Sequence, residues 1–380
     1  MGMVYAAAYG GTGVSLPFIS PWFSAHGLNG ADISAILSAP LLARLVTSPL
    51  LAVWADSWRL RRTPIGLLGL VAAGGYLTLG LARGIAVWLP VWFVAATAMS
   101  SIPPLADVLT MRCARREGFP FAAPRGMGSL AFLLANAIMG ALLAKASINV
   151  VLWWSTAAAA LLAGLTFVLA PPEPVRESGE RLRSAERFRG VGRLLADPDF
   201  LVAIVSVGLI QAAHAFYYAF STLVWKAQAI SAPLWGLLWA TGIAAEIAFL
   251  WLMEPWRTKL GPWVLLMLGG AGAVVRWTAF ALSPPLWLLF PLQLLHGLSF
   301  AASYVAGLQI IERLTPPDSF SAGQTLNSAL SAGVLIGLAT VFSGPLFDRY
   351  GALGYLAMSA LAALGLVGGV RLRRVLGESR

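Results

Sequence analysis

Apolar segments, each long enough to cross a lipid bilayer, recur along the whole 380-residue chain and are bounded by charged residues, Pro or Gly. An α-helix needs about 20 apolar residues to span the hydrocarbon core. The pattern predicts twelve transmembrane helices, over residues 3–24, 31–55, 65–83, 87–111, 124–145, 149–170, 199–224, 232–253, 262–282, 286–311, 321–345 and 352–372. The predicted fold class is therefore an all-α integral membrane protein.

The longest polar interruption separates the sixth predicted span from the seventh. It reads PPEPVRESGERLRSAERFRGVGRLLADP, residues 171–198. This segment is too long for a tight turn and too short for a domain. It predicts an N-terminal half of six helices over residues 1–170, a linker over 171–198, and a C-terminal half of six helices over 199–380.

Lys and Arg residues gather at alternate ends of the predicted spans. One side receives the linker and the arginine-rich clusters at residues 59–62, 112–125, 257–259 and 371–374, together with Arg313. The other side receives only Arg83, Lys145, Lys226 and Arg349. Loops rich in Lys and Arg stay in the cytoplasm. The distribution predicts that both termini are cytoplasmic, in a multi-pass protein of a bacterial-type inner membrane.

Composition narrows the possible partners. Hydrophobic residues make up 58% of the chain and charged residues only 11%, too few to cover a soluble protein of this length. The net charge of +10 comes from helix ends, which argues against nucleic-acid binding. The single cysteine, Cys113, excludes an internal disulfide and the common zinc and iron–sulfur patterns. We expect a monomer whose partners are the lipid bilayer and a small molecule, with no metal.

The predicted spans of the C-terminal half carry polar side chains where hydrocarbon would favour none. A charged residue at the bilayer centre costs about 2.5–3.5 kcal/mol on insertion scales, so such residues usually face a partner or a wet cavity. In span seven, the polar positions repeat at helical spacing and share one face. The candidate residues on spans seven to eleven are Gln211, His214, Tyr218, Trp239, Glu246, Arg276, Gln293, His296, Gln324 and Asn327.

The convergence of these residues favours one hydrated chamber over scattered interhelical hydrogen bonds, which are the alternative. Burial favours the protonated form of a carboxyl group and a neighbouring cation favours the ionised form, so Glu246 is a candidate proton carrier. His296 could relay or hold a proton. Arg276 could either tune Glu246 or bind an anionic substrate through a bidentate contact. A purely structural pair between Glu246 and Arg276 is a further alternative.

Charged residues of the N-terminal half lie nearer the helix ends. Asp107 and Arg125 are expected to pair because they lie toward the same face on neighbouring spans. Asp56 precedes Arg61 and Arg62 in WADSWRLRR. An acid beside a basic cluster suits a latch that forms in one conformation only, so these five residues are candidate gating residues. For Asp56 the alternative is an ordinary solvated loop acid.

Two six-span halves with a basic linker resemble the major facilitator superfamily. WADSWRLRR is similar to its signature between spans two and three, Gly-x-x-x-Asp-Arg-x-Gly-Arg-Arg, although Ala52 stands at the Gly position and Ser57 follows the Asp. The branch that includes phenylpropionate permeases, nucleoside–proton symporters and lactose permease is more similar. The resembling pieces run in order along nearly the whole chain: FISPWFSAHGLNGADISAIL, RGMGS, HAFYY, GLLWATGIAAE, VVRWTAF, QLLHGLSFAASY and FDRYGALGY.

The resemblance implies roles for three residues. Lactose permease uses a Glu on span eight, an Arg on span nine, and a His with a Glu on span ten for proton and sugar. Glu246, Arg276 and His296 lie on the matching spans, whereas Ser299 stands three residues after His296 in place of the second Glu. Proton coupling would therefore depend on Glu246 with less help.

The resemblance implies a proton-coupled symporter that works by alternating access and needs no cofactor besides the proton gradient. We expect a small organic solute, such as a phenylpropionate-like aromatic carboxylate; nucleoside uptake and export are the alternatives within transport. An intramembrane enzyme would need a nucleophile with a base or a metal cluster, and no HxxxH or HExxH spacing supports one. A receptor built on a transporter scaffold would bind without turnover.

Overall fold

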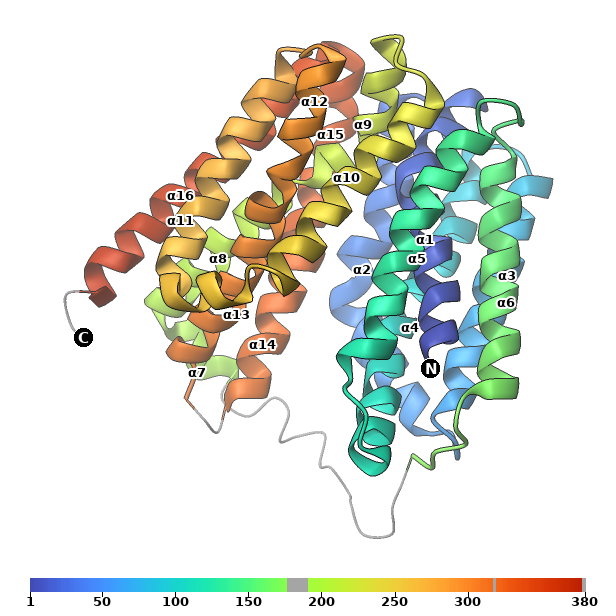
Figure 1. Ribbon diagram of the computed structural model, residues 1–380, viewed down its shortest axis with the longest axis horizontal. Helices are drawn as coiled ribbons and strands as arrows, with labels where there is room; N and C mark the ends of the chain where they lie inside the picture. Colours follow the sequence, from blue (N-terminus) through green and yellow to red (C-terminus); the bar gives the residue numbers. More distant parts are fainter. Residues whose placement is uncertain (176–190, 317–318, 378–380) are drawn as a thin grey trace. The chain divides into compact units, whose positions relative to one another are not determined.

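Helices account for nearly all of the described chain. The computed structural model describes residues 1–175, 191–316 and 319–377 (Figure 1). Within these residues, ten helices are long and apolar enough to cross a membrane, and the last of them, Ala322–Arg374, has 53 residues, enough for two crossings. The 24-residue helix at the N-terminus, Gly2–Ala25, adds a further apolar helix without a charged residue. Each of the twelve predicted spans is therefore helical.

The chain divides into two compact units, which are described separately. One comprises Met1–Glu180 with Trp225–Ala240, and the other comprises Arg181–Val224 with Thr241–Arg380. The predicted boundaries, 1–170, 171–198 and 199–380, stay a prediction. Residues 176–190 of the predicted linker lie outside the described residues.

The first unit contains six long helices. They are α1 (Gly2–Ala25), α2 (Gly30–Asp56), α3 (Arg62–Leu81), α4 (Ile85–Glu117), α5 (Ala122–Leu142) and α6 (Val150–Leu169). Small residues let these helices approach closely: a Cβ on Gly13 of α1 would lie 2.7 Å from the carbonyl oxygen of Phe132 on α5. α4 continues six residues beyond the predicted end at 111, and Gly118 in the left-handed conformation (φ 75°) ends it.

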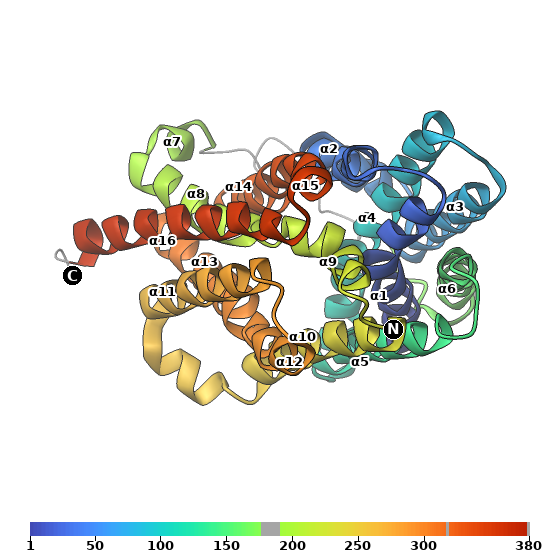
Figure 2. The same ribbon diagram turned by 90° about the horizontal axis from the view of Figure 1, so that it is seen from above.

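The remaining helices lie in the second unit, except for the parts within Trp225–Ala240, which belong to the first. They are α7 (Val191–Ala196), α8 (Pro198–Ala212), α9 (Ala215–Ala227), α10 (Ala232–Trp251), α11 (Glu254–Ala281), α12 (Leu286–Leu294), α13 (Ser303–Leu314), α14 (Phe320–Ala329), α15 (Ile336–Tyr350) and α16 (Tyr355–Gly377). The parts that belong to the first unit are the end of α9 and the first part of α10. α16 packs against both α8 and α11, and both views show α11 and α16 side by side (Figures 1 and 2).

Several predicted spans of this unit are irregular. Span seven breaks between α8 and α9, and π-helical segments over Gly297–Ala302 and Leu330–Leu335 interrupt spans ten and eleven. α11 begins at Glu254, eight residues before the predicted start at 262, and bends at Gly261, where φ is 72°. Hydrophobic periodicity did not predict these features, because a break or a π-turn shifts the helical phase without changing the apolar composition.

Candidate functional site

The side chain of Arg276 lies at the centre of a polar cluster in the second unit. The residue is completely buried on α11. Its Nη1 donates to Nδ1 of His296 at 2.9 Å and to Oγ of Ser299 at 3.2 Å. Its Nη2 donates to Oε1 of Gln293, while the buried Nε has no hydrogen-bond partner. The guanidinium is therefore held through both terminal nitrogens, and its Nε donor is unused.

The charge of Arg276 is not balanced by direct contact with a carboxylate. Within the part of the chain that the structure describes, Arg276 forms no ion pair, whereas ion pairs are formed by Arg116, Arg125, Arg257 and His296. Aromatic faces surround the guanidinium instead, with ring centres at 4.7 Å for Tyr217, 4.5 Å for Trp277 and 5.5 Å for Phe280. Cation–π contacts and neutral acceptors offset only part of the cost of burying a charge. The site therefore favours an anion.

His296 connects Arg276 to the acidic residue Glu246. A guanidinium can only donate, so Nδ1 of His296 accepts and carries no proton in this arrangement. The neutral ring then carries its proton on Nε2, which lies 3.5 Å from Oε2 of Glu246. The Glu246 side chain is 24% exposed, whereas that of His296 is 4% exposed. The chain of contacts runs from a buried cation through an imidazole to a partly accessible carboxyl group.

A second imidazole, that of His214, lies at the break between α8 and α9. Its Nδ1 is 3.1 Å from the carbonyl oxygen of Gln211 and 3.2 Å from that of Ile210, so this nitrogen must be the donor. Its Nε2 then accepts from Oγ of Ser299 at 3.2 Å. Ser299 thus accepts from Arg276 and donates to His214. The hydroxyl group fixes the orientation of both.

The cluster is built where the helices are irregular. Ser299 lies within the π-helical segment, and His214 follows the end of α8. Gln211 links the two segments, since its Nε2 donates to the carbonyl oxygen of Phe300 at 3.2 Å and to Oγ of Ser303 at 2.9 Å. Backbone that leaves the α-helical pattern within a membrane must find its hydrogen bonds inside the protein. The polar side chains of this cluster supply them.

Most of the predicted residues of the C-terminal half come together here. Gln211, His214, Glu246, Arg276, Gln293 and His296 are joined by the contacts above, and the ring of Tyr218 stacks on His214 at 5.8 Å. Two others make their described contacts elsewhere: Gln324 donates to the carbonyl oxygen of Leu308, and Asn327 accepts from Ser331. Trp239 is buried on α10. The functional roles of all these residues stay predictions.

Tyr217 is the main residue that the sequence analysis missed. Its ring lies against Arg276, and its hydroxyl accepts from Nε2 of Gln293 at 2.9 Å. The predicted polar face of span seven ran through Tyr218, one residue later, because it assumed an unbroken helix. Trp277 was missed as well; it stacks on Tyr355 with 5.6 Å between ring centres. The only indication in the sequence was that Tyr217 and Trp277 each lie next to a predicted site residue, Tyr218 and Arg276 respectively.

In the first unit, the predicted pair between Asp107 and Arg125 is present. The Arg125 Nε lies 3.7 Å from Oδ1 of Asp107, and the hydroxyl of Tyr5 donates to the same oxygen at 2.5 Å. The guanidinium of Arg125 also lies over the ring of Tyr9, 4.4 Å from its centre. Both charged side chains are about one-third exposed, at 32% for Asp107 and 34% for Arg125.

The predicted latch residues Arg61 and Arg62 contact the segment that follows α6. Nη2 of Arg61 donates to the carbonyl oxygen of Val175 at 2.8 Å, and Nη1 of Arg62 donates to that of Ala170 at 3.0 Å. Leu60 and Pro174 form an isolated antiparallel bridge at the same place. Asp56 is the exposed last residue of α2. The two arginines therefore fasten residues 170–175 to the loop after α2, an arrangement that the sequence analysis did not predict.

Glu173 adds contacts to this junction between residues 170–175 and the loop after α2. It is 8% exposed and forms an ion pair with Arg116 at the end of α4, and Arg116 also pairs with Glu117 at 2.8 Å. The backbone of Glu173 accepts from the amide of Arg61 at 2.9 Å. The end of α4 contacts the carboxylate of Glu173 and the loop after α2 contacts its backbone carbonyl oxygen, so three separate segments of the first unit meet at this one residue.

Known proteins resemble the chain over nearly its full length. It is 27% identical over 362 residues to the probable 3-phenylpropionic acid transporter of Escherichia coli (strain K12), covering 93% of each chain. It is 26% identical over 361 residues to the maltose permease of Geobacillus stearothermophilus, covering 93% of this chain and 89% of the relative. The crystal structure of the nucleoside transporter NupG superimposes with a TM-score of 0.86 at 16% identity, covering 98% of this chain and 97% of NupG.

The family model described as MFS_1 like family matches residues 1–356. Together with these similarities, the match defines the class of the protein as a multi-pass membrane transporter and not an enzyme. The chain therefore belongs to this family, within the major facilitator superfamily. The predicted fold class, twelve transmembrane helices in two six-helix halves, is confirmed by the fold that it shares with NupG.

Proposed function

We propose that the protein is a proton-coupled symporter of small aromatic carboxylates. The observation that carries this proposal is the completely buried guanidinium of Arg276, which has an unused Nε donor and no ion pair within the described residues. Arginine binds a carboxylate with two parallel hydrogen bonds, so a substrate carboxylate suits it well. The relative named as a probable 3-phenylpropionic acid transporter supports the same class of substrate.

Charge balance explains why a proton would travel with the substrate. Arg276 and an ionised Glu246 sum to zero net charge, although the neutral ring of His296 separates them and leaves the guanidinium without a contacting anion. A substrate carboxylate adds one negative charge in a region of low dielectric, where an unbalanced charge is costly. Uptake of one proton by Glu246 restores the balance. The substrate anion and the proton therefore stabilise each other in the bound state.

His296 would transmit this coupling. When Arg276 turns its donors toward a substrate carboxylate, Nδ1 of His296 loses the hydrogen bond that it accepts. The nitrogen is then free to accept a proton while Nε2 keeps its own. Glu246 and His296 thus form two neighbouring proton-accepting positions, of which Glu246 is the more accessible.

The remaining predictions fit this proposal. We propose that both termini are cytoplasmic and that the monomer lies in a bacterial inner membrane, because the basic residues gather on the side of the predicted linker. We propose two gating contacts, each of which forms in one conformation only. One is the ion pair between Asp107 and Arg125. The other involves Asp56 and the segment that Arg61 and Arg62 hold.

Uptake into reconstituted vesicles tests the proposal. A pH gradient that is acidic outside should drive 3-phenylpropionate into vesicles that contain the wild type. Glu246→Gln should abolish gradient-driven uptake and spare counterflow exchange, because exchange moves substrate without net proton transfer. Glu312→Gln, at an exposed position of α13, is the control and should behave as wild type.

Two results would contradict the proposal. Full active uptake by Glu246→Gln would remove this residue from proton coupling. The second result is binding of a nucleoside or of maltose, with no binding of aromatic carboxylates. The substrate would then belong to the class named for the nucleoside transporter NupG or for the maltose permease.

A further inference from the structure

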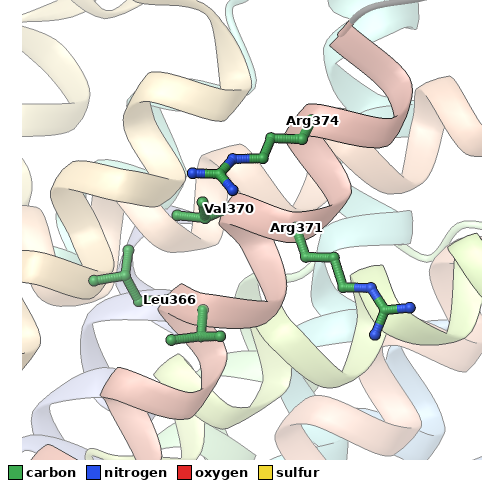
Figure 3. Close-up of a pocket in the computed structure, with 5 residues that line it drawn as sticks. Leu366, Val370, Arg371 and Arg374 are labelled. Atoms are coloured by element: carbon green, nitrogen blue, oxygen red, sulfur yellow. The ribbon is translucent and has the colours of Figure 1, made fainter.

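A hollow lies at the C-terminal end of α16, away from the polar cluster. Its volume is about 520 Å³, and it is lined by Leu366, Val367, Val370, Arg371 and Arg374 (Figure 3). The floor is aliphatic, and the two arginines provide its only charged groups. The hollow therefore combines a hydrocarbon surface with two positive charges.

The arginines follow the aliphatic residues at helical spacing. Leu366, Val370 and Arg374 lie four residues apart and share one face, and each step advances about 6 Å along the helix. Figure 3 shows the guanidinium of Arg374 extending on the side of Leu366 and Val370, while Arg371 leaves the helix in another direction. A hydrocarbon chain lying along this face would therefore end beside a cation.

The packing of α16 on α11 places the hollow near the membrane surface. The two helices are antiparallel, since a Cβ on Gly270 would contact Leu366, and one on Gly369 would contact Met267. Arg371 and Arg374 consequently lie level with the bend at Gly261. Trp251, the last residue of α10, and Trp256, five residues before the bend, are 54% and 70% exposed. Exposed tryptophans are typical of the boundary between hydrocarbon and headgroups.

The two guanidinium groups are available to an anion. Arg371 and Arg374 are both exposed, and they form no ion pair with the residues that the structure describes. Arginine binds phosphate oxygens through its fork of donors. Under the proposed orientation, this end of α16 faces the cytoplasmic leaflet, where basic pockets bind lipid headgroups.

We propose that this hollow binds an anionic phospholipid. One acyl chain lies against Leu366, Val367 and Val370, and the phosphate lies beside Arg374 at the end of that face, while Arg371, which also lines the hollow, adds a second positive charge. The aliphatic floor distinguishes a lipid from free phosphate, which would leave that surface uncovered. The site does not depend on the transported substrate.

Native mass spectrometry of the purified full-length protein in detergent tests this site. Phosphatidylglycerol and phosphatidylcholine with identical acyl chains are the probes. We expect phosphatidylglycerol to bind more tightly, and Arg371→Gln and Arg374→Gln each to weaken it about fivefold. Arg373→Gln removes the same charge from an exposed position that does not line the hollow, and it should change binding less than about twofold.

A second variant tests the hollow without changing its charge. Val370→Phe keeps both arginines and fills the space of the acyl chain, so it should also weaken phosphatidylglycerol binding. If the three arginine variants weakened phosphatidylglycerol binding equally, the lipid would be recognising only the overall surface charge, and the proposal would be overturned. Displacement of the lipid by inorganic phosphate, equal binding of both lipids, or unchanged binding by Val370→Phe would overturn it as well.

Discussion

Replacing Arg276 with lysine keeps the buried charge but removes the planar fork of donors. In the wild type, one guanidinium contacts His296, Ser299 and Gln293, and its Nε remains unused. A lysine ammonium cannot give a carboxylate two parallel hydrogen bonds. The loss of one charge-assisted hydrogen bond costs about 1.5–3 kcal/mol, which weakens the Kd for an aromatic carboxylate by about 10- to 150-fold.

A neutral analogue separates substrate recognition from protein structure. 3-Phenylpropionamide has the same ring and chain but no charge, so Arg276→Lys should weaken its binding by less than about tenfold. Isothermal titration calorimetry of the purified protein with both ligands measures the difference. Arg349→Lys is the control, because Arg349 also lies over an aromatic ring, that of Tyr350 at 5.6 Å, but at an exposed position.

Equal losses for the acid and the amide would refute the reasoning. They would mean that Arg276 only holds Gln293, His296 and Ser299 in place. An unchanged Kd for the acid would refute it equally, since no carboxylate would then reach the guanidinium.

Two further predictions concern stability, measured as the melting temperature in detergent. Ser299→Ala leaves the buried Nε2 of His214 without the hydroxyl that donates to it. We expect the free energy of unfolding to fall by about 1–3 kcal/mol, with a lower melting temperature. Ser343→Ala is the control, because the Ser343 hydroxyl donates to a carbonyl oxygen of its own helix. It should lower the free energy of unfolding by less than about 0.5 kcal/mol. Equal losses for the two variants would contradict the argument. Glu173→Gln should lower the melting temperature by about 2–4 °C, because the carboxylate is buried where three segments meet. Glu117→Gln removes the exposed partner of the same arginine and should have a smaller effect; the reverse order would show that the junction does not depend on Glu173.

The sequence was sufficient to predict the fold class and much of the cluster. Charges within apolar segments are costly, so Glu246 and Arg276 stood out against their surroundings. The sequence analysis expected these two residues to share a chamber with His296, but it did not predict that the ring of His296 lies between them, in contact with both.

Local geometry was not predictable in the same way. Tyr217, and not only Tyr218, reaches the cluster because span seven breaks before it. Ser299 was noticed only as the replacement of a glutamate, yet it joins Arg276 to His214. Hydrophobic periodicity assumes a regular helix, and it loses the correct face wherever the backbone departs from one.

The junction at Glu173 illustrates a different limit. The sequence places Glu173 at the start of the predicted linker, where an acid is expected in solvent. In the structure it is buried by Arg116 and by the backbone near Arg61. Pairing between segments more than fifty residues apart leaves no periodic trace in one sequence.

Substrate-induced proton binding tests the central claim most directly. A pH indicator in weakly buffered solution, with purified protein and saturating 3-phenylpropionate, reports protons taken up on binding. We predict uptake of about one proton per substrate by the wild type, from the charge balance between Arg276 and Glu246, and none by Glu246→Gln. Binding without proton uptake by the wild type, or equal uptake by both proteins, would contradict the account.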